Sequence, residues 1–416
     1  MQRCSSPFRL PADIGKRCKT GERQKEGGRV KPVIDLTKEY GIVLEGGGAR
    51  GAYQIGAWIA LEEAGVKIKG VAGTSVGALN GALICMGDVE NARQLWTHIT
   101  YSQIMAVDDE KMRQLVQEHG FSIEILRDVL AEGGLDVTPL KELIAQKVDV
   151  EKIKNSPTDL YVLTFSVDEG REIDIDIKET PPELIRDYLL ASAYLFPLFK
   201  NEKLHGKTYI DGGAVNNVPL GSLVERGYED IIVIRIYGIG REKRVKIPEG
   251  TSIYTIAPTV SLGSILDFNP TTSQLHIRRG YFDGKRMIYG LAGKIYYIDE
   301  QEEECYYLKQ LIDLAPQIRE YLMEVYKLEQ DSSRYLRNMT EIILPALAEE
   351  MKLGKNWNYR ELYLTMLEAA AKLCRVRKYQ IYTVQDLQEK VWERLLKRTG
   401  EELPAFVQVI AKDRLI

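Results

Sequence analysis

The chain has no hydrophobic run long enough to cross a membrane as a helix. Its longest apolar stretches, at 81–85 and 231–234, fall far short of the roughly 20 residues that a membrane-spanning helix needs. The first 37 residues also lack the apolar core of a secretory signal. We therefore expect any contact of this chain with a membrane to be peripheral.

Cysteine and histidine are scarce too. The five cysteines are odd in number and scattered, with no C-x-x-C pair and no metal-ligand spacing relative to the four histidines. Dispersed cysteines fit a reducing compartment, so the sequence predicts a cytoplasmic protein. It shows no pattern of metal ligands, and we expect neither a metal nor a diffusible cofactor.

What is present is the composition of a folded protein with a basic tail. Hydrophobic residues make up 44% of the 416 residues and charged residues 28%, which is typical of globular chains. Residues 1–31 hold nine Lys and Arg against three Asp and Glu, although the whole chain carries a net charge of −4. This stretch has no periodic pattern that could bury a face. We predict that residues 1–37 form a disordered basic tail, and we assign it no function and no nucleic-acid partner.

Two units of strand, glycine turn and helix follow the tail in tandem. A short apolar strand at 40–45 leads into a glycine-rich run and a helix that ends at Gly65. A second strand, at 66–72, leads into the turn 73–77 and a helix of small residues at 78–86. Such units usually form parallel strands with helical crossovers, and their functional loops lie at the carboxyl ends of the strands. Both glycine turns should therefore share one edge of a sheet.

The rest of the chain alternates between helical and strand patterns. Helices are predicted at 89–98, 110–118, 123–131, 139–147 (capped by Thr138) and from 183 onward, and strands at 159–167, 172–177, 207–210 and 231–236. Beyond residue 300, Tyr, Leu, Glu and Lys recur at helical spacing in about four helices. We predict a three-layer α/β/α sandwich with a mainly parallel central sheet over residues 38–300, followed by a helical C-terminal extension over residues 301–416.

The turn after the second strand matches G-x-S-x-G, the nucleophile elbow, and consists of Gly73, Thr74, Ser75, Val76 and Gly77. In that motif a tight corner between strand and helix exposes the serine oxygen, and a side chain at 73 or 77 would collide with a neighbouring element. The helix amino terminus after Ser75 offers free N–H groups and partial positive charge to a developing oxyanion. Because five-residue matches also arise by chance, a catalytic serine and a bystander serine are both open interpretations of this motif alone.

The first glycine-rich run has the G-x-G-x-x-G spacing of a dinucleotide-binding turn and consists of Gly46, Gly47, Gly48, Ala49, Arg50 and Gly51. A dinucleotide site needs an Asp or Glu at the end of the following strand, about 20 residues further on. Here that strand ends at Ala72 and leads directly into the serine elbow. This argues against NAD and for a loop whose backbone N–H groups bind an oxyanion.

Hydrolysis through a serine requires a base, and none of the four histidines has a convincing place. His98 and His119 lie in polar helical stretches, His205 precedes a strand, and His276 lies in a loop-like segment. We interpret all four as surface residues, so the sequence does not support a Ser-His-Asp triad.

A carboxylate is better placed than any histidine. Asp211 closes the strand at 207–210 and opens the turn Asp211-Gly212-Gly213. It should therefore stand at the same edge of the sheet as Ser75. A carboxylate there can contact the serine directly, and desolvation beside the serine should raise its basicity.

Together these segments resemble the signature of a known family. The loop 46–51, the elbow 73–77 and the turn 211–213 are similar, in order and in element, to the three signature blocks of patatin-like phospholipases. The segment 191–199 resembles the A-S-x-x-x-P block that precedes the aspartate in that family. The resemblance is to the bacterial type and covers about residues 38–300, with its end marked by 267–270 and 279–281.

The resemblance implies a serine acyl hydrolase with a Ser-Asp dyad. Ser75 would attack the ester carbonyl, Asp211 would accept its proton and later activate water, and backbone N–H groups of the loop 46–51 would stabilise the tetrahedral intermediate. The implied substrates are fatty-acyl esters of phospholipids or lysophospholipids. A broad-specificity carboxylesterase and a catalytically silent lipid-binding module remain as alternatives, and an NAD-binding oxidoreductase is less favoured.

Several charged residues near these motifs have more than one possible role. Glu45 stands where many members of the family carry a small residue or Asp, so it could alter the mouth of the site. Arg50 matches the family's basic loop position and could support the loop, attract a phosphate or pack against a helix. The basic run 241–246 could contact anionic lipid head groups, although such runs are more often solvated loops.

Overall fold

The computed structural model describes residues 31–119, 134–200, 203–397 and 403–412. Most of the predicted basic tail and the predicted helix at 123–131 lie outside these residues. Within the described ranges, no helix is both long enough and apolar enough to cross a membrane.

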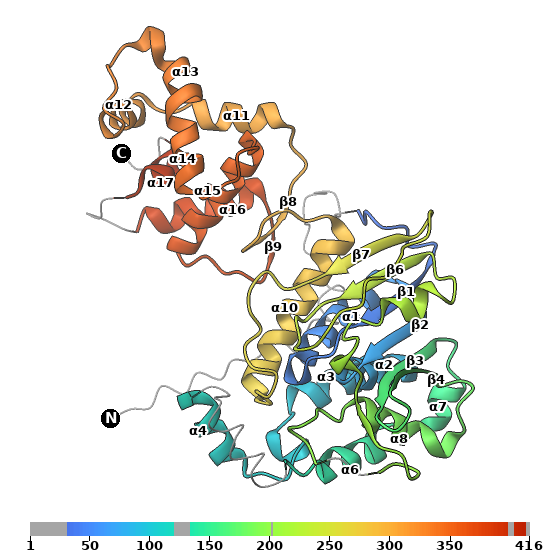
Figure 1. Cartoon of the computed structure of the whole chain (residues 1–416). Coiled ribbons are helices and arrows are strands. Elements are labelled where there is room, and N and C mark those ends of the chain that lie inside the picture. Colours follow the sequence, from blue (N-terminus) through green and yellow to red (C-terminus); the bar gives the residue numbers. More distant parts are fainter. Residues whose placement is uncertain (1–30, 120–133, 201–202, 398–402, 413–416) are drawn as a thin grey trace, which may run out of the picture. The chain divides into compact units, whose positions relative to one another are not determined.

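A seven-stranded sheet forms the centre of the first part of the chain (Figure 1). Its strands are β1 (Glu39–Leu44), β2 (Lys67–Thr74), β3 (Asp159–Ser166), β4 (Arg171–Asp176), β5 (Tyr209–Asp211), β6 (Asp230–Ile234) and β7 (Ser252–Ile256). They follow the order β4-β3-β2-β1-β6-β7, and β5 also pairs with β3. The pairs β1–β2, β1–β6, β2–β3 and β6–β7 are parallel, whereas β4 and β5 run antiparallel to β3. The predicted parallel pairing of the two tandem units is confirmed.

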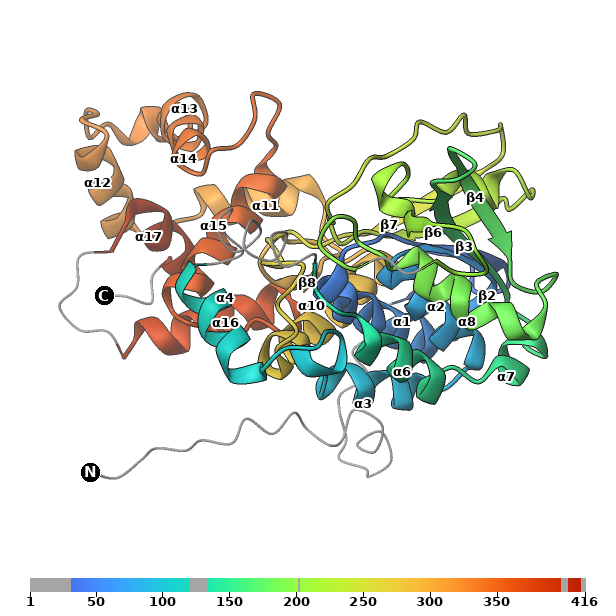
Figure 2. The same cartoon turned by 60° about the horizontal axis from the view of Figure 1, so that its bottom comes forward.

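Helices cover one face of this sheet and a thinner layer covers the other. On the first face lie α1 (Ala52–Ala64), α2 (Val76–Met86), α3 (Val89–Thr97), α8 (Pro182–Ser192) and α10 (Pro270–Tyr289). Figure 2 shows α1, α2 and α8 together on one side of the strands. On β1, Ile42 and Leu44 face this larger core, whereas Val43 faces a smaller cluster under the short helix α9 (Leu220–Val224). The predicted three-layer sandwich with a mainly parallel sheet is confirmed.

Glycines allow α1 and α10 to pack with their backbones in contact. A Cβ atom at Gly56 would lie 1.9 Å from the carbonyl oxygen of Ile277, and one at Gly280 would lie 1.9 Å from that of Tyr53. Neither β7 nor α10 is predicted from the sequence. The interpretation of His276 as a surface residue in a loop is wrong, because it lies in α10 and is only 2% exposed.

A helical segment separates α3 from β3. Its described helices are α4 (Asp109–His119), α6 (Thr138–Lys147) and α7 (Val150–Lys154). Thr138 begins α6 and does not cap it, contrary to the prediction. The Asp136 side chain instead accepts hydrogen bonds from the N–H and the hydroxyl of Thr138, at 2.8 and 2.7 Å.

A second hydrophobic cluster is formed by residues from Tyr296 to Ala411. The helices here are α11 (Glu304–Ile312), α12 (Pro316–Val325), α13 (Tyr335–Asn338), α14 (Leu344–Glu350), α15 (Tyr359–Leu373), α16 (Val384–Leu395) and α17 (Ala405–Ala411). The described residues of this segment thus form more helices than the four predicted, and short helices such as α13, α14 and α17 account for the difference. Two short strands, β8 (Tyr297–Asp299) and β9 (Ile381–Thr383), pair in parallel. The predicted domain boundary at residue 300 stays a prediction.

Candidate active site

Ser75 occupies a strained turn between β2 and α2. Its φ of 56° and ψ of −127° lie outside the regions that residues other than glycine usually adopt. A Cβ atom at Gly73 would lie 2.4 Å from the carbonyl oxygen of Gly77, and one at Gly77 would lie 2.3 Å from that of Leu44. The predicted collisions at 73 and 77 are confirmed, and the turn has the geometry of a nucleophile elbow.

The register of β3 brings Asp211 to this turn. Thr74, the last residue of β2, pairs with Leu163, and Asp211, the last residue of β5, pairs with Thr164. Because β4 occupies the opposite edge of β3, β2 and β5 share one edge and meet end to end. Ser75 follows Thr74, so its side chain reaches Asp211 and donates a hydrogen bond to the carboxylate.

The Asp211 carboxylate is buried next to the serine. Burial raises its pKa to about 6, while hydrogen bonds from the Ser75 hydroxyl and the Gly213 N–H act in the opposite direction. The Gly213 N–H lies 2.7 Å from Oδ1 of Asp211. A desolvated carboxylate that already accepts the serine hydrogen bond is well suited to take the serine proton.

The loop predicted to bind an oxyanion divides into two parts. Gly47 and Gly48 line the same cavity as Ser75, and their N–H groups have no hydrogen bond to any residue that the structure describes. Other N–H groups of the loop are already bonded within the protein, namely Gly46 to Asn217, Ala49 to Ile265 and Arg50 to Gly47. Gly48 also has a φ of +55°, which favours glycine. Gly47 and Gly48 thus present the N–H groups that an oxyanion could use.

Two buried side chains, to which the sequence assigned no role, fix these loops by hydrogen bonds. The Ser192 hydroxyl accepts a hydrogen bond from the Ser75 N–H at 2.9 Å and donates one to the Leu163 carbonyl at 2.6 Å. The Asn217 side chain donates to the Gly46 carbonyl at 3.0 Å. The A-S-x-x-x-P resemblance includes Ser192, whereas no sequence signal marked Asn217.

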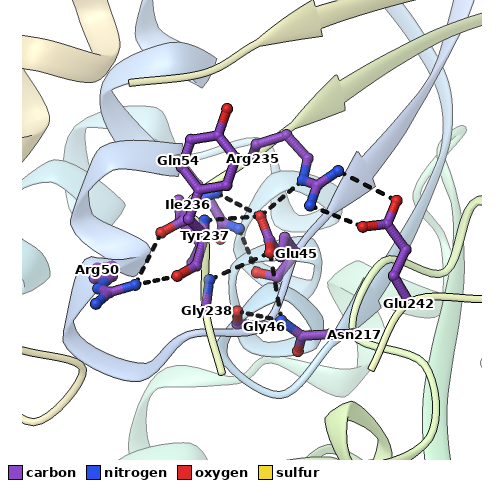
Figure 3. A network of polar contacts seen from close by, with 10 residues as sticks. All are labelled: Glu45, Gly46, Arg50, Gln54, Asn217, Arg235, Ile236, Tyr237, Gly238 and Glu242. Atoms are coloured by element: carbon purple, nitrogen blue, oxygen red, sulfur yellow. Dashed lines mark hydrogen bonds and ion pairs between the residues drawn. The ribbon is translucent and has the colours of Figure 1, made fainter. Parts of the chain in front are cut away.

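Glu45 is the centre of a buried polar network beneath the loop (Figure 3). Its Oε2 atom accepts hydrogen bonds from the N–H groups of Ile236 and Tyr237, at 2.7 and 2.9 Å, and from Nε of Arg235, at 3.0 Å. Its Oε1 atom accepts from the Gly238 N–H at 3.2 Å. Glu45 therefore holds the segment 236–238 against the glycine loop and does not line the cavity.

Arg50 donates hydrogen bonds to carbonyl oxygens of two loops, and Figure 3 shows its contacts with Ile236 and Tyr237. Its Nε donates to Gly263 at 2.9 Å, and its Nη1 donates to Ile236 at 3.4 Å and to Tyr237. Of the roles that the sequence left open for Arg50, these contacts support stabilisation of the loop.

No histidine of the described residues lines the cavity with Ser75. His98 and His205 are exposed, and His205 contacts Asp187 at 2.8 Å. The buried His276 has a pKa lowered to about 4 by desolvation and by Arg279 and Arg50. In the same described ranges, no group of three or more His, Cys, Asp or Glu side chains is placed to hold a metal. The expectation that no cofactor is needed stays a prediction.

A mostly apolar cavity begins at Ser75. It encloses about 960 Å³ of space not filled by atoms, part of which is open to solvent. Asp211 and Lys147 are its titratable lining residues, and most other lining residues are Leu, Ile, Val, Phe and Ala. The apolar lining of this cavity is typical of sites that bind apolar small molecules.

The parallel sheet, with a serine elbow at the carboxyl end of one strand, defines the class as an α/β protein with a nucleophile-elbow site. Residues 42–224 match the family model described as patatin-like phospholipase. The chain therefore contains a patatin-like phospholipase domain within these residues, which are less than half of its length. The matched residues end at 224, whereas the resemblance from sequence extended to about 300.

Curated relatives match parts of the chain. Lysophospholipase nte1 of Aspergillus terreus is 59% identical over 46 residues, which are 11% of this chain and 3% of that protein. Neuropathy target esterase sws of Drosophila melanogaster is 29% identical over 205 residues, which are 47% of this chain and 13% of that protein. The chain thus spans a small fraction of the length of these relatives. Both come from eukaryotes, so they do not confirm the predicted bacterial type.

Two solved structures show a weaker likeness. VipD from Legionella pneumophila has a TM-score of 0.41 and 13% identity, with 90% of each chain covered. ExoU, in its complex with SpcU from Pseudomonas aeruginosa, has a TM-score of 0.31 and 15% identity, with 92% of this chain and 75% of that chain covered. These scores are too low to support an argument about this chain.

Proposed function

We propose that this chain hydrolyses fatty-acyl esters of phospholipids or lysophospholipids through an acyl-serine intermediate on Ser75, with Asp211 as proton acceptor. The observation that carries the proposal is the hydrogen bond from Ser75 to a buried Asp211 at one end of an apolar cavity. The family match over residues 42–224 supports lipid acyl hydrolysis. The names of the relatives, a lysophospholipase and an esterase, fit cleavage of an ester.

In the acylation step, the Ser75 oxygen attacks the ester carbonyl while its proton passes to the Asp211 carboxylate. The negative charge that develops on the carbonyl oxygen accepts hydrogen bonds from the N–H groups of Gly47 and Gly48. The amino terminus of α2, directly after Ser75, adds a partial positive charge. When the intermediate collapses, the alcohol part of the lipid leaves with the proton from Asp211, and the acyl group stays on Ser75.

In the deacylation step, Asp211 is again a carboxylate and acts on water. It takes one proton from a water molecule whose oxygen attacks the acyl-serine carbonyl. The second tetrahedral intermediate uses the same N–H groups of Gly47 and Gly48. Its collapse releases the fatty acid, and the Ser75 oxygen recovers its proton from Asp211.

Covalent labelling tests this proposal directly. A fluorophosphonate should label the purified protein at Ser75, as located by peptide mass spectrometry, and Ser75→Ala should remain unlabelled. The same protein should release fatty acid from phospholipid vesicles in the presence of a chelator. Label on another serine, or none on Ser75, would contradict the assignment of the nucleophile. Absence of both label and release would favour the silent lipid-binding module.

A broad carboxylesterase would use the same two residues, so the substrate must be tested separately. We expect the kcat/KM for phospholipid or lysophospholipid to exceed that for a soluble short-chain ester, because the apolar cavity favours a long acyl chain. The reverse order of the two kcat/KM values would favour the carboxylesterase.

The pH dependence of hydrolysis should report Asp211. Its pKa is raised to about 6 by burial, and only the unprotonated carboxylate can accept the serine proton. The kcat/KM should therefore rise with pH up to about 6 and level off above it. Replacing the exposed His98 and His205 by glutamine should leave this inflection in place. A shift of the inflection in either variant would point to a histidine base.

Peripheral contact with a lipid surface is part of the proposal. Phe196, Tyr237 and Ile239 are 64%, 55% and 73% exposed, and Ile239 also lines the cavity. Arg241, in the basic run 241–246, is exposed close by in sequence, whereas Lys243 is paired with Glu172. Exposed apolar side chains followed in sequence by a basic residue suit an anionic membrane surface. The cytoplasm remains our predicted compartment.

A further inference from the structure

Two helix faces with the same spacing form the walls of the cavity. On α2 the lining residues are Val76, Leu79, Asn80 and Leu83, and on α6 they are Leu140, Leu143, Ile144 and Lys147. Both sets follow the positions i, i+3, i+4 and i+7, which lie on one side of an α-helix. The cavity is therefore a slot that follows the length of two helices.

The slot leads away from the serine along α2. Ser75 directly precedes α2, and Leu83 lies eight residues after Ser75. This separation corresponds to about 12 Å along the helix. At the end of α2, the Met86 sulfur accepts a hydrogen bond from the Asp149 N–H at 3.2 Å. Val148, which precedes Asp149 and lines the cavity, thus lies at the end of the slot away from Ser75.

The polar groups along this slot are not available to a ligand. Asn80 donates to the Gly51 carbonyl and to Gln54, at 3.0 and 2.9 Å, and its Oδ1 accepts from Trp96 at 2.9 Å. Lys147 is exposed, so its aliphatic stem can cover the far end while its ammonium group stays in water. What remains facing the space is apolar side chain, which matches a hydrocarbon chain along its whole length.

We propose that the acyl chain of the substrate lies in this slot, with its carbonyl carbon at Ser75 and its methyl end toward Leu83 and Val148. Leu83 and Leu143 then determine which chain lengths are accepted. This inference rests on the proposed function, because it takes Ser75 as the point where the acyl group is attached.

Chain-length profiles test the inference. Kinetic constants would be measured for p-nitrophenyl butanoate, octanoate, dodecanoate and palmitate. Leu143→Trp places a bulky side chain in the slot, and it should lower kcat/KM for palmitate relative to butanoate by at least about tenfold, since hydrophobic pockets discriminate by about 10- to 200-fold per methylene. Ala145→Trp, on an exposed position of the same helix that does not line the cavity, should leave the profile unchanged.

A second pair of variants opens the far end. Leu83→Ala should shift the preference toward longer chains, whereas Ile84→Ala, equally buried but not lining the cavity, should not. Thermal unfolding of all four variants would show that they are folded. Unchanged profiles in both Leu143→Trp and Leu83→Ala, with hydrolysis intact, would overturn the inference.

Binding without turnover separates this inference from the catalytic proposal. Calorimetry would measure the binding of the four corresponding free fatty acids to Ser75→Ala and to Ser75→Ala combined with Leu143→Trp. This measurement requires no hydrolysis. Loss of long-chain binding in the double variant would support the slot even if the wild type proved inactive. Equal binding to both proteins would overturn the slot, whatever the fate of the proposed dyad.

Discussion

Replacing Asp211 by asparagine should abolish fatty-acid release and leave the fold more stable at neutral pH. Asparagine has nearly the same shape and its Oδ1 can still accept the hydrogen bond from the Gly213 N–H, but it cannot take the serine proton. General-base catalysis contributes about 10²- to 10⁴-fold to a rate. Because Asp211 would serve in both the acylation and the deacylation step, we expect a loss near the upper end of that range.

The stability effect has the opposite sign from the catalytic one. Burial raises the pKa of Asp211 from 3.8 to about 6, so the folded protein binds this proton more tightly than the unfolded chain does. The contribution of Asp211 to stability is then complete below pH 3.8 and is lost as the pH rises through about 6. A shift of about two units corresponds to about 3 kcal/mol. Asp211→Asn should therefore gain up to about 3 kcal/mol at about pH 8 and almost nothing at about pH 4.

Urea unfolding at both pH values, together with fatty-acid release from vesicles, would measure the two effects. Asp187→Asn is a suitable control. Within the described residues, the polar contact of the Asp187 side chain is with the exposed His205, and Asp187 does not line the cavity. It should change neither rate nor stability. Substantial activity in Asp211→Asn would rule out the dyad and return attention to the histidines. Equal stability of wild type and Asp211→Asn at both pH values would contradict the desolvated carboxylate.

The sequence placed Ser75 and Asp211 at one edge of the sheet by a rule for parallel strands, which applies to Ser75 after β2 but not to Asp211, the last residue of the antiparallel β5. Residues at the carboxyl ends of parallel strands share one edge of a sheet, so the elbow could be placed without knowing the strand order. The sequence did not show that β5 is antiparallel. Asp211 of β5 pairs with Thr164 of β3, and Thr74 of β2 pairs with the preceding residue, Leu163. This register joins residues far apart in the sequence, so no local sequence pattern indicates it.

The elements that escaped prediction depend on contacts distant in sequence. The polar sequence of α10 hides its helical pattern, and this helix is buried because Gly56 and Gly280 allow it to approach α1 closely. His276, which lies in this helix, is buried with it. The far wall of the cavity could not be anticipated either, because it requires α6 to face α2 across a space that neither helix pattern reveals.

The role of Glu45 at the site also depends on contacts distant in sequence, so it could not be predicted. The sequence marked it only as an unusual residue before the glycines. The structure instead shows five protein donors around one buried carboxylate, three of them backbone N–H groups of consecutive residues, Ile236, Tyr237 and Gly238. A loop organised around a single side chain is decided by tertiary structure, since the loop itself has no pattern that requires a carboxylate.

Glu45→Gln should destabilise the protein by about 3 kcal/mol, because the new amide NH₂ would face N–H donors and leave buried groups without acceptors. The catalytic effect should be large as well. Gly238 packs against Gly46 and Gly47 so tightly that a Cβ atom at 238 would lie 1.8 Å from the Gly46 carbonyl oxygen. Displacement of 236–238 would therefore move Gly47 and Gly48 from the oxyanion position. Since misplacement by about 1 Å can cost about 100-fold in rate, we expect a loss of that order in kcat/KM.

The adjacent Glu242 offers a control that separates the network from its surface charge. Glu242 contacts the same Arg235 guanidinium at 3.0 Å but its side chain is 54% exposed. Glu242→Gln should cost less than about 1 kcal/mol, as exposed ion pairs do, and should not alter kcat. If Glu45→Gln behaved like Glu242→Gln in both urea unfolding and hydrolysis, the contacts of Arg50 with the Ile236 and Tyr237 carbonyls would be sufficient to hold the loop 236–238 without the carboxylate. A large loss of stability with an unchanged kcat/KM would instead show that Glu45 supports the fold but not the position of the glycine N–H groups.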